Sequence, residues 1–292
     1  MGTDCVLHLY AAKQTDAEKI SQAAIAEVMR IEARYSRYRS DSVLSAINRV
    51  AEAGESIDVD DETTGLLNYA FAANQKSDGL FDISSGILRK AWDFQLGRLA
   101  DQFVLDRLLT RVGLTKVSWR APRLAFAVPG MELDFGGLAK EYAADMAAET
   151  CQALGAEHGV VDLGGDIRII GPHPSGEAWK IGIRHPRCPG KIMATAVLKH
   201  GALATSGDYE RYIEIDGKRY SHILNPKTGW PVHGLCSVSV IADRCLVAGS
   251  VCTIAMLKGQ YGTEWLKTLG VEHCWMNEGQ EQFCTGTFIH EY

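Results

Sequence analysis

The sequence has no long apolar run. A helix that spans a bilayer needs about 20 consecutive, mainly apolar residues, and no stretch of the 292-residue chain approaches that length. The first five residues, MGTDC, contain neither the basic segment nor the apolar segment of a secretory signal peptide. We therefore expect no transmembrane segment, and a location that is cytoplasmic as written or periplasmic where a leader has been removed.

Positive charge is not in excess either. The chain has 30 Lys and Arg against 36 Asp and Glu, which gives a net charge of -6 that is spread along its length. A nucleic-acid-binding surface needs clustered basic residues, so the composition argues against a nucleic-acid partner. With 46% hydrophobic and 23% charged residues, the chain has the composition of an ordinary globular protein.

The cysteines include no C-x-x-C pair, and most of them have apolar neighbours. They are Cys5, Cys151, Cys188, Cys236, Cys245, Cys252, Cys274 and Cys284. A chain of this length can build a core without disulfides. We interpret the cysteines as buried free thiols rather than a disulfide framework, which favours a reducing compartment.

Hydrophobic periodicity predicts an α+β fold. Helices are expected at 16–37, 61–77, 246–258 and 261–269, after Gly137, and in the first part of 102–119, which ends in a short strand. Strands are expected at 4–11, 131–135, 158–163, 166–171, 178–184, 192–199, 210–215 and 236–242. Because strands follow one another without intervening helices, a mixed or largely antiparallel sheet with packed helices fits better than a doubly wound parallel sheet.

The most informative segment is LDFGGLAKEYAAD at 133–145, where a strand is expected to run through two glycines into a helix. Gly136 and Gly137 allow a close approach of the backbone to a ligand, and a helix start offers free N–H groups to an anion. Lys140 adds positive charge in the first turn. The arrangement suits a pyrophosphate, although a tight connector requires the same glycines and the segment lacks the G-x-G-x-x-G pattern.

A histidine stands between two glycine-containing loops. His222 follows a hairpin predicted from Asp216-Gly217 and precedes the loop NPKTGWP at 225–231. A single histidine is more often structural, but this position favours acid or base chemistry. A further Gly-Gly turn lies in VDLGGDI at 161–167, where flanking aspartates are equally suited to capping the turn.

In their order along nearly the whole chain, these segments resemble the ApbE family of FAD:protein FMN transferases. The matching segments are MGT (1–3), SRYRSDS (36–42), DGLFDISSG (78–86), DFGGLAKEYAAD (134–145), LGGDI (163–167), SGDYERY (206–212), YSHILNPKTGWPV (220–232) and, in part, AGSVCT (248–253). The resemblance implies one ApbE-like domain over residues 1–292 with a T-fold-related architecture. It also implies Mg²⁺-dependent cleavage of FAD and attachment of FMN, through a phosphoester, to a Ser/Thr flavinylation motif of an acceptor protein.

The resemblance assigns roles to individual positions. It implies His222 as the catalytic base near the reacting phosphate. It implies contacts to the flavin dinucleotide from Met1, Tyr38, Leu80, Phe81, Asp82, Asp134, Lys140 and Leu224. It implies magnesium ligands at the main chain of Gly137 and at the hydroxyl of Thr253.

One position departs from the family pattern in a way that bears on the metal. The family's A-D-A-L-x-T places an Asp four residues before the Thr, and this chain has Gly249 there. Asp166 and Asp208 are candidates to replace the missing carboxylate. Asn225 also stands where many members have Asp. Two alternatives therefore stay open: a protein of the same fold that binds FAD without transferring it, and an FAD hydrolase that releases FMN and AMP.

Overall fold

The computed structural model describes residues 2–94 and 96–290. The chain forms two compact units. Unit 1 comprises Met1–Glu32, Leu138–Tyr209 and His233–Tyr292, and unit 2 comprises Ala33–Gly137 and Glu210–Val232. The single flavin transferase domain over residues 1–292 stays a prediction.

Unit 1 is built on a seven-stranded sheet in which every neighbouring pair is antiparallel, in the order β1-β5-β6-β9-β12-β13-β14. Its strands are β1 (Cys5–Tyr10), β5 (His158–Leu163), β6 (Asp166–Gly171), β9 (Ala202–Gly207), β12 (Leu235–Ala242), β13 (Glu272–Asn277) and β14 (Gln282–Cys284). The α+β class with a largely antiparallel sheet is thereby confirmed.

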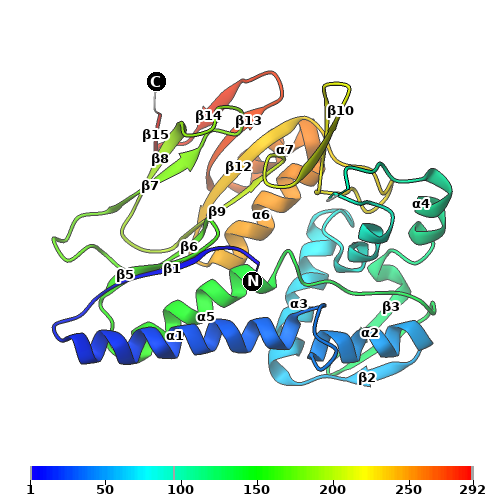
Figure 1. Cartoon of the computed structure of the whole chain (residues 1–292), viewed down its shortest axis with the longest axis horizontal. Helices are drawn as coiled ribbons and strands as arrows, with labels where there is room; N and C mark the ends of the chain where they lie inside the picture. The colour runs from blue at the N-terminus through cyan, green and yellow to red at the C-terminus, as the bar shows by residue number, and fades with distance from the viewer. Residues whose placement is uncertain (1, 95, 291–292) are drawn as a thin grey trace. The chain divides into compact units, whose positions relative to one another are not determined.

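Both faces of this sheet are covered (Figure 1). Helices α5 (Ala139–Ala153) and α6 (Cys245–Lys258) pack on one face, against β5, β6, β9 and β12. The three-stranded sheet of β7 (Trp179–Arg184), β8 (Ile192–Leu198) and β15 (Phe288–His290) shares a hydrophobic cluster with the other face. Strand β12 is consequently buried from Leu235 to Val240, as expected of a strand with both faces covered.

The remaining elements of unit 1 are η3 (Gly259–Tyr261), α7 (Gly262–Leu269) and most of α1 (Gln14–Tyr35). Both η3 and α7 pack against α6. The helix predicted at 16–37 is thus found within two residues of its expected limits. Within residues 2–94 and 96–290, no helix combines the length and the apolar character required to cross a bilayer.

Unit 2 contains short helices, a three-stranded sheet in the order β2-β4-β3, and a β10-β11 hairpin. Its elements are α2 (Val43–Ala53), β2 (Ser56–Asp58), α3 (Asp61–Lys76), η1 (Ile83–Lys90), α4 (Gln102–Leu109), η2 (Leu114–Lys116), β3 (Val117–Arg120), β4 (Arg123–Phe126), β10 (Tyr212–Ile215) and β11 (Lys218–Ser221). Asp60 caps α3 by accepting the Thr63 N–H at 2.9 Å. The predicted hairpin turn is confirmed, because Asp216 and Gly217 have φ angles of 51° and 72°.

Residues 131–135 were expected to form a strand, and the structure contradicts this. The Asn48 side chain holds Leu133 instead, since its amide donates to the Leu133 carbonyl at 2.9 Å and accepts the Leu133 N–H at 2.8 Å. The next N–H, that of Asp134, donates to the Ile83 carbonyl at 2.8 Å. An apolar segment whose backbone groups bind a side chain and a loop is extended without belonging to a sheet.

The interpretation of all cysteines as buried free thiols is also wrong. Cys274 and Cys284 form a disulfide, because antiparallel pairing of β13 with β14 places them directly opposite each other. Cys5 is exposed. Four of the others are buried free thiols as predicted: Cys151, Cys236, Cys245 and Cys252.

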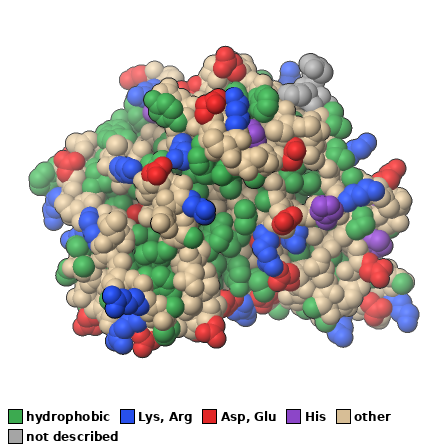
Figure 2. Space-filling view, turned by 180° about the vertical axis from the view of Figure 1, so that it is seen from behind, with side chains coloured by type: hydrophobic (Ala, Val, Ile, Leu, Met, Phe, Trp, Pro, Cys, Tyr) green, Lys and Arg blue, Asp and Glu red, His purple; other side chains and the backbone are tan. Residues whose placement is uncertain are grey.

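Basic and acidic side chains are interspersed with hydrophobic ones on the face drawn in Figure 2. Elsewhere among the described residues, opposite charges are ion-paired, including Arg187 with Asp208 and Arg244 with Glu149. The surface charge of the chain is therefore mixed in sign at short range, in keeping with its modest net charge of -6.

Candidate functional site

In unit 2, Asp134 supports the Gly136-Gly137 turn. Its Oδ1 accepts the Gly136 N–H at 2.8 Å, and its Oδ2 is ion-paired with Arg37. Gly86 leaves the room that this carboxylate needs, because a Cβ atom at Gly86 would lie 2.2 Å from the Asp134 Cβ. Asp134 thus fixes the backbone where the chain leaves unit 2 for helix α5.

Tyr38 presents an aromatic ring to solvent. The side chain is 82% exposed, although its hydroxyl accepts a hydrogen bond from Arg37 Nη2 at 2.7 Å. The Arg37 guanidinium also lies over the ring, 4.8 Å from its centre. An exposed ring that is held on one side by a fixed cation is suited to stacking on a planar ligand such as a flavin.

The turn at 78–82 is shaped by its own hydrogen bonds. Phe81 is buried, and its ring lies 3.9 Å from where a Cβ atom at Gly137 would be. Asp82 caps η1: Oδ1 accepts the backbone N–H of Ser84 at 2.8 Å, and Oδ2 accepts the N–H of Leu114 at 3.0 Å. Leu80 is half-buried beside them. Because both Asp82 oxygens serve the fold, this residue positions the turn more than it offers a free carboxylate.

His222 lies at the end of strand β11 with its ring exposed. Its Nδ1 is 3.1 Å from the carbonyl oxygen of Arg211, and a carbonyl only accepts, so Nδ1 carries the proton. The lone pair of the neutral ring is then on Nε2. This backbone contact fixes both the tautomer and the orientation of the ring, as a general base requires.

The loop after His222 forms without an aspartate. The Asn225 side-chain oxygen accepts the Lys227 N–H at 2.8 Å, which is the turn that an Asp would make. Leu224 forms an isolated bridge with Pro231 and packs against the hydrophobic cluster of unit 2. The substitution of Asn225 for the family's Asp therefore leaves the local structure intact.

In unit 1, Lys140 lies in the first turn of α5 and is ion-paired. Its Nζ is 2.6 Å from Asp166 Oδ2. Burial raises the pKa of Asp166, although the attraction of Lys140 acts in the opposite direction. The cation that was predicted to meet a pyrophosphate is thus already held by a buried acid, and any anion at this helix start would share it with Asp166.

Neither acid that was considered as a substitute for the missing carboxylate stands alone. Asp166 binds Lys140, and Asp208 is bound by both terminal nitrogens of Arg187, at 2.7 and 2.6 Å. The carboxylate that lies against Gly249 belongs to Glu141, which the sequence analysis missed. A Cβ atom at Gly249 would be 2.6 Å from Glu141 Cγ and 2.9 Å from Glu141 Oε1. The available signal was an acid next to Lys140 in the first turn of the same helix.

Glu141 is buried, with 7% of the residue exposed. Within the described chain, its Oε2 atom has no hydrogen-bond partner. Burial, and to a lesser extent the neighbouring Asp166, raise the pKa of Glu141 to about 8. One turn beyond Gly249 on α6, the Thr253 hydroxyl lies 3.2 Å from the hydroxyl of Ser206.

Residues 2–94 and 96–290 contain no group of three or more His, Cys, Asp and Glu side chains arranged to hold a metal ion. Magnesium sites in proteins commonly use only one or two carboxylates together with substrate phosphates.

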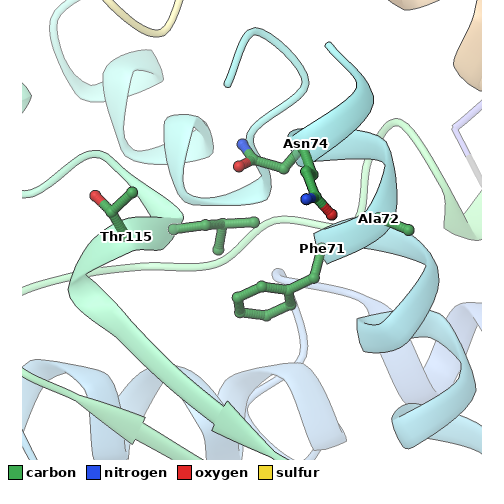
Figure 3. Close-up of a pocket in the computed structure, with 6 residues that line it drawn as sticks. Phe71, Ala72, Asn74 and Thr115 are labelled. Carbon is green, nitrogen blue, oxygen red and sulfur yellow. The ribbon is translucent and has the colours of Figure 1, made fainter. Parts of the chain in front are cut away.

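Two hollows lie within unit 2, and none of the predicted site residues lines either of them. One, of about 430 Å³, lies beside α3 and includes Phe71, Asn74 and Thr115 (Figure 3). The Asn74 amide donates to the Phe81 carbonyl at 2.9 Å, so the hollow borders the turn that carries three predicted flavin contacts. Met1, the remaining predicted contact, lies outside the described residues.

The predicted residues are thus divided between the two units. Tyr38, Leu80, Phe81, Asp82, Asp134, Gly137, His222 and Leu224 belong to unit 2, whereas Lys140 and Thr253 belong to unit 1. Within unit 2 the structure brings Phe81 against Gly137. Within unit 1 it brings Gly249 against Glu141 and Lys140 against Asp166.

Solved structures that resemble this one include an ApbE protein and a flavin transferase ApbE. The structure is similar to the ApbE protein of Thermotoga maritima, with a TM-score of 0.88, 32% identity, and coverage of 98% of this chain and 94% of that one. It is also similar to the flavin transferase ApbE from Vibrio cholerae, with a TM-score of 0.83, 25% identity, and coverage of 98% and 95%.

The chain belongs to the ApbE family, whose family model matches residues 1–275. Among its relatives, the FAD:protein FMN transferase of Treponema pallidum is 35% identical over 283 residues, which are 89% of this chain and 77% of the relative. That of Haemophilus influenzae is 30% identical over 255 residues, 84% of this chain and 74% of the relative.

Proposed function

We propose that this chain is an FAD:protein FMN transferase. It cleaves FAD and joins the FMN phosphate to the hydroxyl of a Ser or Thr in the flavinylation motif of an acceptor protein, with release of AMP. The observation that carries the proposal is family membership along almost the whole chain, with relatives that bear this name. The exposed, oriented His222 provides the base that such a transfer requires.

The acceptor hydroxyl oxygen attacks the phosphorus of the FMN half, and the P–O–P bond to the AMP half breaks. AMP leaves with the bonding electron pair, and the hydroxyl proton passes to His222 Nε2. Phosphoryl transfer of this kind depends mainly on positioning and charge stabilisation.

Other residues of the chain position the substrate. The exposed ring of Tyr38 stacks on the flavin, and Asp134 keeps the glycine turn open through Gly136. The start of α5 has no side-chain cap, so its first N–H groups are suited to a phosphate, with Lys140 adding positive charge. Leu80, Phe81, Asp82 and Leu224 shape the two loops of unit 2 on which this binding depends.

A divalent cation fits the residues present. Glu141 and Thr253 offer oxygen atoms on one side of α6, and oxygen is the ligand that Mg²⁺ prefers. The buried Glu141 Oε2 has no partner among the described residues, so a cation would satisfy it. When bound, Mg²⁺ neutralises diphosphate charge and polarises the phosphorus that is attacked. The main-chain oxygen of Gly137 remains a proposed further ligand.

Incubation with FAD, Mg²⁺ and an acceptor that carries the Ser/Thr motif tests the proposal. We expect the intact mass of the acceptor to rise by the mass of an FMN residue, and chromatography to show AMP in equal amount. Free FMN and AMP without a modified acceptor would mean that the chain is an FAD hydrolase. FAD that stays bound and intact, with several acceptors and metals, would mean that it is a flavin-binding protein without transferase activity.

A further inference from the structure

We propose that Glu141 is the carboxylate ligand of the divalent cation in this chain, in place of the acid that is missing at Gly249. The inference rests on the proposed metal-dependent function. It assigns to a residue on α5 a role that the family pattern assigns to α6. Both helices belong to unit 1 and pack against each other (Figure 1).

The first observation is that Glu141 occupies the space beside Gly249. A Cβ atom at Gly249 would lie 2.6 Å from Cγ, 2.9 Å from Oε1 and 3.1 Å from Cδ of Glu141. Contacts shorter than 3.0 Å are essentially never seen for real Cβ atoms. The Glu141 carboxylate therefore occupies the volume into which a side chain at position 249 would extend. The glycine and the glutamate fit each other, because the absence of one side chain makes room for the other.

The second observation is that one oxygen atom of the Glu141 carboxylate lacks a hydrogen-bond partner among the described residues. Glu141 is 7% exposed, and its buried Oε2 has no hydrogen-bond partner within the described chain. The adjacent cation, Lys140, is bound to Asp166 at 2.6 Å. A buried carboxylate oxygen without a partner is costly, and a divalent cation would satisfy it.

The third observation is that Thr253 provides a second oxygen atom for a cation. Thr253 follows Gly249 by four residues on α6, so the two positions are neighbours on one face of the helix. The Thr253 hydroxyl is hydrogen-bonded to Ser206 at 3.2 Å, which restricts its orientation. A carboxylate from α5 and a hydroxyl from α6 form an all-oxygen set that suits Mg²⁺ or Mn²⁺ and leaves room for water and phosphate.

The test measures metal binding directly, without reference to catalysis. Binding of Mn²⁺ to the purified full-length chain is followed by electron paramagnetic resonance, with Mg²⁺ as competitor. We expect Glu141→Gln to weaken Mn²⁺ binding by at least the ~10-fold typical of lost metal-site partners. The double variant Glu141→Gly with Gly249→Asp moves the acid to the other helix, and we expect it to restore affinity to within about threefold of wild type.

Glu149→Gln is the matched control, because Glu149 lies on the same helix and makes a surface ion pair with Arg244 at 2.6 Å. It should bind Mn²⁺ like the wild type. Circular dichroism melts of each variant show whether it is folded. Unchanged Mn²⁺ affinity in Glu141→Gln would overturn the assignment and leave Glu141 as a neutral buried acid. A folded double variant without Mn²⁺ affinity would overturn it as well.

Failure of this inference and failure of the proposed function give different results. If the wild type modifies the acceptor while Glu141→Gln binds Mn²⁺ normally, the ligand assignment is wrong and the transferase function stands. If Mn²⁺ binding depends on Glu141 but no acceptor gains FMN, the ligand assignment stands and the transferase function is wrong.

Discussion

Replacing Gly249 alone with aspartate tests the packing between α5 and α6. The new Cβ would lie 2.6 Å from Glu141 Cγ, about 0.8 Å inside the 3.4 Å at which ordinary contact begins. Glu141 is buried and its helix packs on α6, so the side chain cannot swing freely into solvent. Overpacking a buried site costs about 1–3 kcal/mol, and a second buried carboxylate without full partners costs about as much again.

We therefore expect Gly249→Asp to lower the free energy of unfolding by about 2–6 kcal/mol in the presence of a chelator. Urea denaturation of the wild type, Gly249→Asp, Glu141→Gly and the double variant measures this in a double-mutant cycle. The second substitution removes both the clash and the second acid, so the double variant should be more stable than the sum of the single changes predicts. We expect a favourable interaction energy of about 1.5 kcal/mol or more.

Gly65→Asp serves as the matched control, because Gly65 is an exposed helical glycine whose Cβ would meet no atom within 4 Å. Its unfolding free energy should stay within about 0.5 kcal/mol of the wild type. The packing argument would be refuted by a Gly249→Asp variant as stable as the wild type. Additivity of the two changes within about 0.5 kcal/mol would refute it too.

Three further predictions concern catalysis, metal and pH. His222→Ala should slow FMN transfer by ~10²–10⁴-fold, measured as acceptor mass gain over time, and a near-normal rate would exclude the base role. Thr253→Ala should raise the Mg²⁺ concentration needed for half-maximal transfer, and an unchanged titration would leave Thr253 as a packing residue. Burial raises the pKa of Glu132, but Lys90 and Arg89 lower it more, to below its ordinary 4.5. The ion pairs of Glu132 therefore stabilise the folded chain above about pH 4.5, and this stabilisation is lost as the pH falls through the lower pKa that Glu132 has in the folded state. The unfolding free energies of Glu132→Gln and the wild type, measured by urea denaturation, should therefore differ by about 1 kcal/mol at pH 7 and become equal near pH 3. An equal difference at both pH values would contradict this.

Hydrophobic periodicity predicted the long helices and strands, because an element with one face in the core repeats its apolar residues with the period of that element. Helix 61–77 and strand 236–242 were found within one residue of their limits, since each has a stripe or run of apolar residues facing a core. Strand β9 was missed because ALATSG consists mainly of small residues and has few of the bulky residues typical of strands. The hydroxyl of its half-buried Thr205 is paired across the sheet with the Ser239 hydroxyl at 2.8 Å, a contact that no local pattern reveals.

Among the site residues, those defined by local turns were predictable. Gly136, Gly137 and the turn that precedes Phe81 depend on neighbours within a few positions, and the motifs contain those neighbours. The partners of these residues were not predictable. Arg37 pairs with Asp134 across 97 positions, and Lys140 pairs with Asp166 across a strand and a helix. Such pairs are set by tertiary packing.

Gly249 and Glu141 show that a residue missing from a motif can have a chemically similar neighbour in space. Position 249 of α6 has no acid, yet the Glu141 carboxylate on the neighbouring helix α5 lies against it in space. A close-packed interior fills a region of space, and the atoms that fill it can come from either of two neighbouring helices. The Glu141 carboxylate extends from α5 into the space left by Gly249, and Thr253 lies one turn further along the same face of α6. An acid is therefore present beside position 249, although it extends from α5 and not from α6.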